Sequence, residues 1–227
     1  MRHISSIRIT KILIAVILLC GSALVSDSCS SGIDDEQAGV DSIETMQYFY
    51  YYEGKKIPLT LNKDKVIVSV PKDCNETRER ILANVQPLDS IDDQSMDIFV
   101  ISRSDFSKIE SKDSWKEDSK NVILTQSYFT EGKKEVYSSP YLMVRLKREQ
   151  DKALLSSYAE KYRLRMTSDG PLSPLMPLWH GLAVTPESEK SPLTCANELW
   201  ESGDFAATAP DLVPSESMLC AMDGTSN

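Results

Sequence analysis

Two hydrophobic periods follow one another in the last third of the chain. Residues 141–147 alternate apolar and polar side chains, which is typical of a half-buried strand. Residues 149–162 then place apolar side chains at helical spacing, with Leu154 and Leu155 among them. Residues 163–167 return to strand character. The pattern therefore predicts strand, helix and strand in that order.

The same order recurs up to residue 209. Residues 178–185 alternate again and predict a strand. Ser191 can then cap a helix whose first residue is Pro192, and Gly203 is placed to end it. Residues 205–209 form the last expected strand. The sequence predicts α+β class with a C-terminal ferredoxin-like βαββαβ (split βαβ) domain over 140–213, an antiparallel sheet with both helices on one face.

A smaller β-rich α+β region is expected over 45–139. Its aromatic first run, YFYYY, is consistent with a ligand-stacking platform or simply with β-propensity and packing. The pattern over 103–120 assigns no element, and turns are expected at 62–64 and at Glu131. Strands are expected at residues 48–52, 57–61, 66–70 and 97–101, a helix at 76–86 and a hairpin at 121–139.

The first 28 residues have the organisation of an export signal. Arg2, Arg8 and Lys11 precede the apolar run ILIAVILL, and small residues follow it. Such a run is shorter than a membrane-spanning helix requires. A lipoprotein signal is expected, with Cys29 as the lipidated residue, and Cys20 is the alternative. A plain secreted protein, cut after Ala23 or Ser28, also stays open.

These features predict an exported protein, anchored by lipid to the membrane of the cell envelope on its periplasmic or outer-surface side. Residues 29–44 are small and polar and form a flexible tether, and 214–227 form a tail. The sequence does not distinguish the inner from the outer membrane.

Composition narrows the possible chemistry. The net charge of −9 makes the chain a poor partner for nucleic-acid phosphates. Only His3 and His180 are histidines, so poly-histidine metal sites are excluded, and no metal or other cofactor is expected. We find no paired acid and base motif and no phosphate-binding glycine loop, so catalytic residues are not expected.

Three cysteines follow the leader and tether. Cys74, Cys195 and Cys220 allow one disulfide at most, and the sequence does not identify the pair. Cys195 lies on the apolar side of its helix, which favours a buried thiol over a reactive one.

Two stretches resemble one protein family. The segment CANELWESGDFAATAPDLV is similar to the last helix and strand of the N-terminal prodomains of secreted subtilisin-like serine proteases of Gram-negative bacteria. The segment YYYEGKKIPLTLNKDKVIVSV resembles the start of those prodomains, so the similarity spans about residues 46–213. The matching residues in the first segment are Ala196, Asn197, Glu201, Ser202, Gly203, Phe205, Pro210 and Asp211.

The resemblance implies a binding role and not catalysis. No catalytic domain follows the matching segment in this sequence, and Ser226, in the final Gly-Thr-Ser, has neither a base nor an oxyanion hole. In the family, the open sheet face docks on the protease and the segment after the last strand enters the substrate cleft. The residues expected to contact the cleft are Pro210, Asp211, Leu212 and Val213.

Two functions therefore stand side by side. The first is a non-catalytic, lipid-anchored protein that inhibits or chaperones a subtilisin-like serine protease, with a truncated protease precursor as a variant. The second is a cell-envelope lipoprotein that binds another protein or a glycan. The sequence leaves the oligomeric state undetermined.

Overall fold

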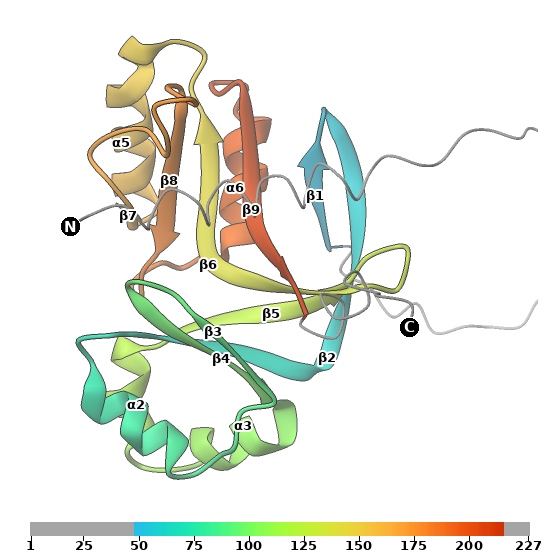
Figure 1. Ribbon diagram of the computed structural model, residues 1–227, viewed down its shortest axis with the longest axis vertical. Coiled ribbons are helices and arrows are strands. Elements are labelled where there is room, and N and C mark those ends of the chain that lie inside the picture. Colours follow the sequence, from blue (N-terminus) through green and yellow to red (C-terminus); the bar gives the residue numbers. More distant parts are fainter. Residues whose placement is uncertain (1–47, 216–227) are drawn as a thin grey trace, which may run out of the picture. The chain divides into compact units, whose positions relative to one another are not determined.

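A computed structural model describes residues 48–215, which form a mixed α+β unit with a nine-stranded antiparallel sheet (Figure 1). The α+β class and the antiparallel sheet are thereby confirmed. The strands are β1 (Tyr48–Tyr52), β2 (Lys55–Pro71), β3 (Asp89–Asp92), β4 (Met96–Ser102), β5 (Ile123–Phe129), β6 (Glu135–Arg145), β7 (Leu164–Met166), β8 (Trp179–Val184) and β9 (Ala207–Pro214). The helices are α2 (Asn75–Leu82), α3 (Arg103–Glu110), α4 (Trp115–Asp118), α5 (Lys152–Lys161) and α6 (Pro192–Glu201), with short 3-10 turns at Ser119–Asn121 and Glu149–Asp151.

One order of elements occurs twice. In the first segment (residues 55–129), the order is β2, α2, β3, β4, α3 and β5, with the short helix α4 and a 3-10 turn inserted before β5. The strands lie in the order β5-β2-β4-β3. In the second segment (residues 135–214), β6, α5, β7, β8, α6 and β9 follow one another. Their strands lie in the equivalent order β9-β6-β8-β7. The chain thus repeats the same connection pattern.

Strand β6 joins the two segments. Near its start, Tyr137 pairs with Ser127 of β5, while near its end Arg145 pairs with Trp179 of β8. Strand β9 runs along the opposite edge, with a register shift between Ser138 and Leu142. The domain boundary expected between residues 139 and 140 lies inside β6.

The two segments bury their sheet faces differently. Helices α2 and α3 cover one face of the first segment with a cluster that includes Val68, Phe99 and Phe106. The opposite face of that sheet, which carries Ile98 and Val100, belongs to the same core as α5 and α6. In the second segment, α5 and α6 lie behind the strands, and the front of the sheet carries no helix (Figure 1).

Helix α6 forms where its local signals place it. The Ser191 hydroxyl accepts a hydrogen bond from the Thr194 backbone N–H, and Pro192 takes the first turn, where no N–H is required. Gly203 follows the helix with a φ of 71°, a conformation that favours glycine. The prediction for this helix is confirmed.

Several elements differ from the sequence prediction, among them α3 and α4, which lie where the pattern over 103–120 assigns no element. The turn expected at 62–64 is a register shift inside the continuous strand β2, where the Asn62 side chain accepts a bond from the Asp64 N–H at 3.1 Å. Strand β9 continues to Pro214, beyond the expected end at residue 209. Strand β3 was not expected, because its sequence, DSID, is polar.

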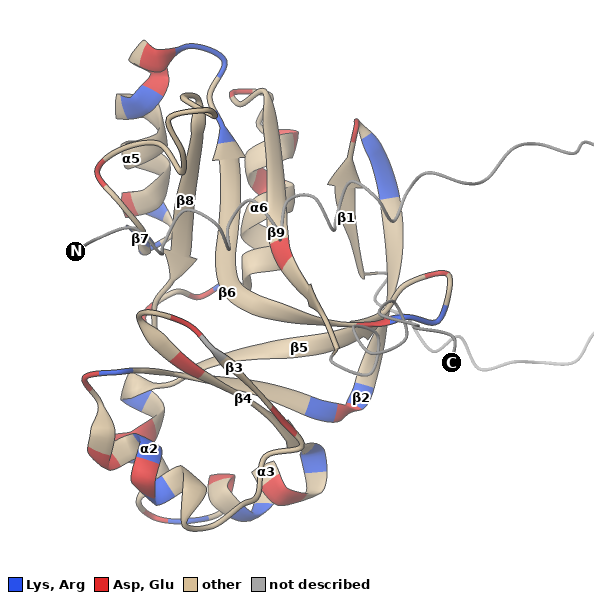
Figure 2. Cartoon of the chain, viewed as in Figure 1, with Lys and Arg blue, Asp and Glu red and all other residues tan. Residues whose placement is uncertain are grey.

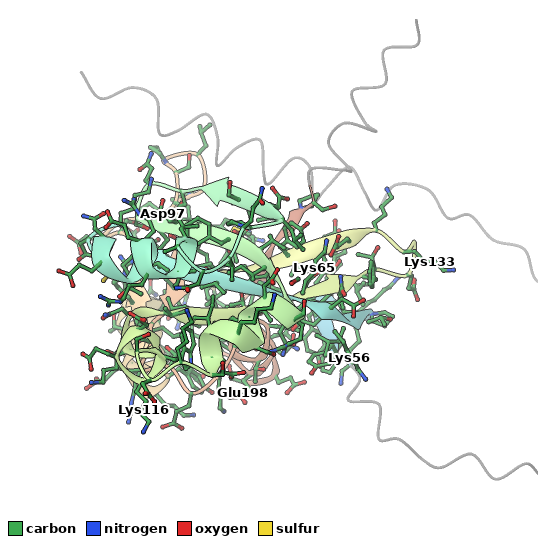
Figure 3. All side chains as sticks on the ribbon, turned by 90° about the horizontal axis from the view of Figure 1, so that it is seen from below. Lys56, Lys65, Asp97, Lys116, Lys133 and Glu198 are labelled. Carbon is green, nitrogen blue, oxygen red and sulfur yellow. The ribbon has the colours of Figure 1, made fainter. Side chains whose placement is uncertain are left out.

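The leader, the tether, Cys20, Cys29 and Cys220 lie outside the described residues. Within 48–215, no helix is both long enough and apolar enough to span a bilayer. Exposed lysines such as Lys56, Lys116 and Lys133 point outward around the described unit (Figure 3).

Candidate protein-binding face

The front of the second segment's sheet is the candidate site. Leu142 and Val144 point back into the core with α5 and α6, so their neighbours along β6 must point forward. The pairing of β6 with β8 and β9, and of β8 with β7, then aligns forward side chains from four strands. We call this surface the open face, and it consists of Tyr141, Met143, Arg145, Arg165, Trp179, Gly181, Ala183, Ala207, Ala209 and Asp211. Gly181 and Ala183 are buried, and the other members are partly or fully exposed.

Small and uncharged side chains form the middle of the open face. Met143 pairs with Gly181 on one side and with Ala209 on the other. Figure 2 shows β8 and much of β6 and β9 without charged residues. Arg145 and Arg165 are exposed at its margins. The exposed part of the centre, around Met143 and Ala209, is therefore nearly uncharged, and it is better suited to protein contact than to a small ligand.

The β7–β8 loop lies on one margin of the open face. The Leu172 N–H donates to the Trp179 carbonyl at 2.7 Å, which fixes the loop to the start of β8. A Cβ atom on Gly181 would lie 2.9 Å from Leu172 Cδ2 and would also collide with the Thr167 hydroxyl. Glycine at this position therefore lets the loop approach the sheet closely.

The β3–β4 turn of the first segment lies on another margin. The Tyr141 hydroxyl donates to Asp93 Oδ1 at 2.6 Å and lies 2.7 Å from the Ser95 hydroxyl. Burial opposes ionisation of Asp93, but hydrogen bonds from Tyr141 and Ser95 hold the pKa of its carboxyl below the ordinary value. This turn therefore connects the two segments through a partly buried polar network.

Asp211 lies at the same seam. Burial raises the pKa of its carboxyl, a hydrogen bond from the Ser139 hydroxyl at 2.6 Å opposes the rise, and the charge of Asp93 adds to it. The charge of Asp93, in the first segment, therefore acts on Asp211, in the second.

We expect D211N to flatten the pH dependence of stability. The folded chain holds the Asp211 proton to a higher pH than the unfolded chain does, so stability falls as the pH rises from 3.8 through the folded pKa. Asparagine carries no charge and avoids that loss, so the variant should gain stability relative to the wild type as the pH rises. Urea unfolding at several pH values from 4 to 8 measures the difference. D169N, a change at an exposed position, is the control, and a wild-type pH profile for D211N would contradict the expectation.

The residues expected to contact a protease cleft lie within β9. Pro210 is buried and pairs with Leu142, while Leu212 pairs with Ser138 and packs beside the cluster of Leu59 and Tyr128. The sequence pattern places this stretch after the last expected strand, and the structure instead includes it in β9. Pro210 and Pro214 have no backbone N–H, which also leaves β9 poorly suited to pair with a further strand.

The residues that match the prodomain motif connect α6 to its surroundings. Asn197 Nδ2 donates to the Phe49 carbonyl at 2.8 Å, and Glu201 accepts a bond from the Tyr51 hydroxyl at 2.8 Å. Ala196 is buried in the core, and its carbonyl accepts a hydrogen bond from the Thr208 hydroxyl. These three residues thus attach strands β1 and β9 to the helix.

The end of the motif turns the chain from α6 into β9. The Ser202 hydroxyl donates to the Leu199 carbonyl at 2.7 Å, and Gly203 supplies the left-handed turn. Phe205 is buried, with its ring centroid 5.3 Å from that of Tyr158 on α5. Each residue has a structural role, so the motif specifies how this helix and strand pack.

The aromatic strand β1 uses its rings inside the described unit. Tyr48 packs against Tyr128 at 5.3 Å between centroids, and Tyr51 stacks on Trp200 of α6 at 5.5 Å. Lys56 Nζ lies 4.2 Å from the centre of the Phe49 ring. The packing interpretation of this run accounts for these contacts.

Neither His180 nor Cys195 lies on the open face. His180 is 4% exposed, burial lowers its pKa, and its Nδ1 atom has no hydrogen-bond partner. Cys195 is fully buried, as predicted, and burial raises the pKa of its thiol to about 12. Cys74, which is half-buried, is not bonded to it.

The described residues contain no group of three or more His, Cys, Asp or Glu side chains placed to hold a metal ion. The shallow depressions that the structure does describe lie between the two segments. One of them is lined in part by Ser95 and Arg165 and so reaches the margin of the open face. Another, of about 270 Å³, is lined by residues such as Val122, Val184 and Pro192. Comparison of the chain with protein-family models, with curated proteins and with solved structures finds no match.

Proposed function

We propose that this protein is a non-catalytic binder of a subtilisin-like serine protease, which it inhibits or helps to fold. The second segment, in this proposal, is a ferredoxin-like domain that docks through its open face. The strand order β9-β6-β8-β7, with α5 and α6 together behind the sheet, is the observation that supports it most directly.

The first segment supplies an internal precedent for this use of the sheet. It has the same order of elements, and the face of its sheet opposite α2 and α3 is buried against the rest of the chain through Ile67, Ile98 and Ile123. The equivalent face of the second segment has a middle of small, uncharged residues and remains partly exposed. Covering a surface of this kind with a folded partner is favourable, because it removes apolar area from water.

The proposal also assigns a position to the anchor. Cys29 carries the lipid, and residues 29–44 tether the binding unit to the membrane of the cell envelope. A prodomain-like protein that binds only the native protease stabilises the native form by mass action. This would suit a chaperone as well as an inhibitor.

The open face can be tested by a single substitution. We expect A209R to weaken protease binding by at least about tenfold, because it places a charged side chain at the centre of the open face. Ala209 is partly exposed, so the arginine can extend into solvent without entering the core. Residues 30–227 are titrated against a panel of subtilisin-like proteases, and both binding and peptide hydrolysis are followed.

The control is a similar change away from the open face. L88R alters a residue that is 58% exposed on the loop between α2 and β3. Tight binding by wild type and L88R, lost in A209R, supports the proposal. Degradation of the wild type without inhibition by every protease tested, including any encoded nearby, rejects it and favours the envelope-binding alternative.

A further inference from the structure

The β7–β8 loop presents one leucine to solvent. Leu175 is 90% exposed, the largest value among the exposed large hydrophobic residues of the described chain. A leucine side chain held in water forgoes the free energy of burial. Because Leu175 is exposed on a well-fixed loop, it indicates a contact with a partner more strongly than the other, scattered exposed leucines do.

The turn that carries Leu175 is built to be rigid. Ser173 and Met176 form an isolated bridge, with the Met176 N–H donating to the Ser173 carbonyl at 2.9 Å. Pro174 occupies the second position of this four-residue turn, where its fixed φ is favoured. Leu175, in the third position, does not have a positive φ, which is consistent with a type I turn.

Hydrogen bonds on both sides fix the turn to the sheet. The Leu175 N–H donates to the Ser173 hydroxyl at 3.2 Å, and the Trp179 N–H donates to the Met176 carbonyl at 3.0 Å. On the other side, Leu172 rests against the sheet at Gly181, which belongs to the open face. The leucine is therefore presented beside the open face, and little conformational entropy remains to be lost on binding.

The loop carries no charged residue after Asp169. In a chain with 26% charged residues, the stretch from Gly170 to Val184 (GPLSPLMPLWHGLAV) contains none. Exposed loops are usually polar. An uncharged, proline-rich turn instead matches an apolar, water-excluding pocket on a protein surface.

We propose that Leu175 is the specificity anchor of the open face and inserts into an apolar pocket on the same protease. This inference rests on the proposed function, because it names a second contact made by the same docked partner. A protease active site accepts extended chain, and a tight turn is a poor substrate. Leu175 therefore binds as a fixed side chain and the loop remains uncut.

The test compares four versions of residues 30–227 against the proteases that bind the wild type. These versions are the wild type, L175S, A209R and the remote control L88S. We expect L175S to weaken binding by roughly ten- to a hundredfold, as the loss of one buried leucine predicts. L88S should bind like the wild type. Circular dichroism and urea unfolding establish that each variant is folded, and mass spectrometry of the bound protein locates any cut.

The outcomes separate this inference from the proposed function. Binding that A209R abolishes and L175S leaves unchanged overturns the anchor while the proposed function stands. A cut between Leu175 and Met176 also overturns it, because the loop would then be a substrate. If the wild type binds no protease, the proposed function fails and the anchor fails with it.

Discussion

Replacing Ile98 by alanine should destabilise both segments of the chain together. Ile98 is almost fully buried on the face of β4 that shares a core with α5 and α6. A cavity at such a position costs about 2–5 kcal/mol of unfolding free energy. Because β6 continues from one segment into the other and the core is shared, we expect a single cooperative transition at a lower denaturant concentration.

Hydrogen exchange measured during urea unfolding tests this expectation. Amides of β4 in the first segment and of β8 in the second should lose protection at the same urea concentration in I98A. L124A, at a residue of the same segment that is 45% exposed, should cost less than about 1 kcal/mol. Separate transitions for the two strands would show that the segments are independent domains.

The sequence predicted the second segment well because its signals are local. The alternation in β6 and β8 and the Ser191 cap each determine their element without help from distant residues. The motif around Asn197 and Gly203 was also visible, although only the structure shows that these residues attach β1 and turn the chain into β9.

The first segment was harder to predict because its signals depend on tertiary contacts. Strand β3 is polar and is specified by its pairing with β4. Helix α3 is capped by Ser102, but only Phe106 and Ile109 mark its buried side. With β3 and α3 missing from the prediction, the repeat of one element order could not be recognised.

The open face was predictable only in outline. A ferredoxin-like order implies one sheet face without helices, so the existence of the open face followed from the predicted topology. The margins of the open face could not be predicted in this way. Tyr141 and Asp93, which are hydrogen-bonded, lie far apart in sequence, and no sequence pattern indicates that Leu172 lies against Gly181. The exposure of Leu175 likewise depends on the fold of the whole loop.

The effect of shortening the chain should depend on whether β9 is kept. A chain that ends at Ser215 keeps the full strand and should fold like the longer chain. A chain that ends at Ala209 loses the pairing of residues 210–214 with β6 and the burial of Pro210. We expect this second truncation to cost several kcal/mol, a large share of the roughly 5–15 kcal/mol that stabilises a typical domain. Circular dichroism and thermal unfolding compare the two chains.

The chain that ends at Ser215 also separates docking from inhibition. Its open face and the Leu175 turn are intact, so the proposed function predicts that it still binds the protease. If the segment that enters the substrate cleft follows β9, this chain should bind without blocking peptide hydrolysis, while residues 30–227 do both. Full inhibition by the shorter chain would mean that docking alone obstructs the cleft or that the end of β9 itself reaches it. An inability of both chains to bind would reject the role of the open face, because the shorter chain retains every residue to which that role is assigned.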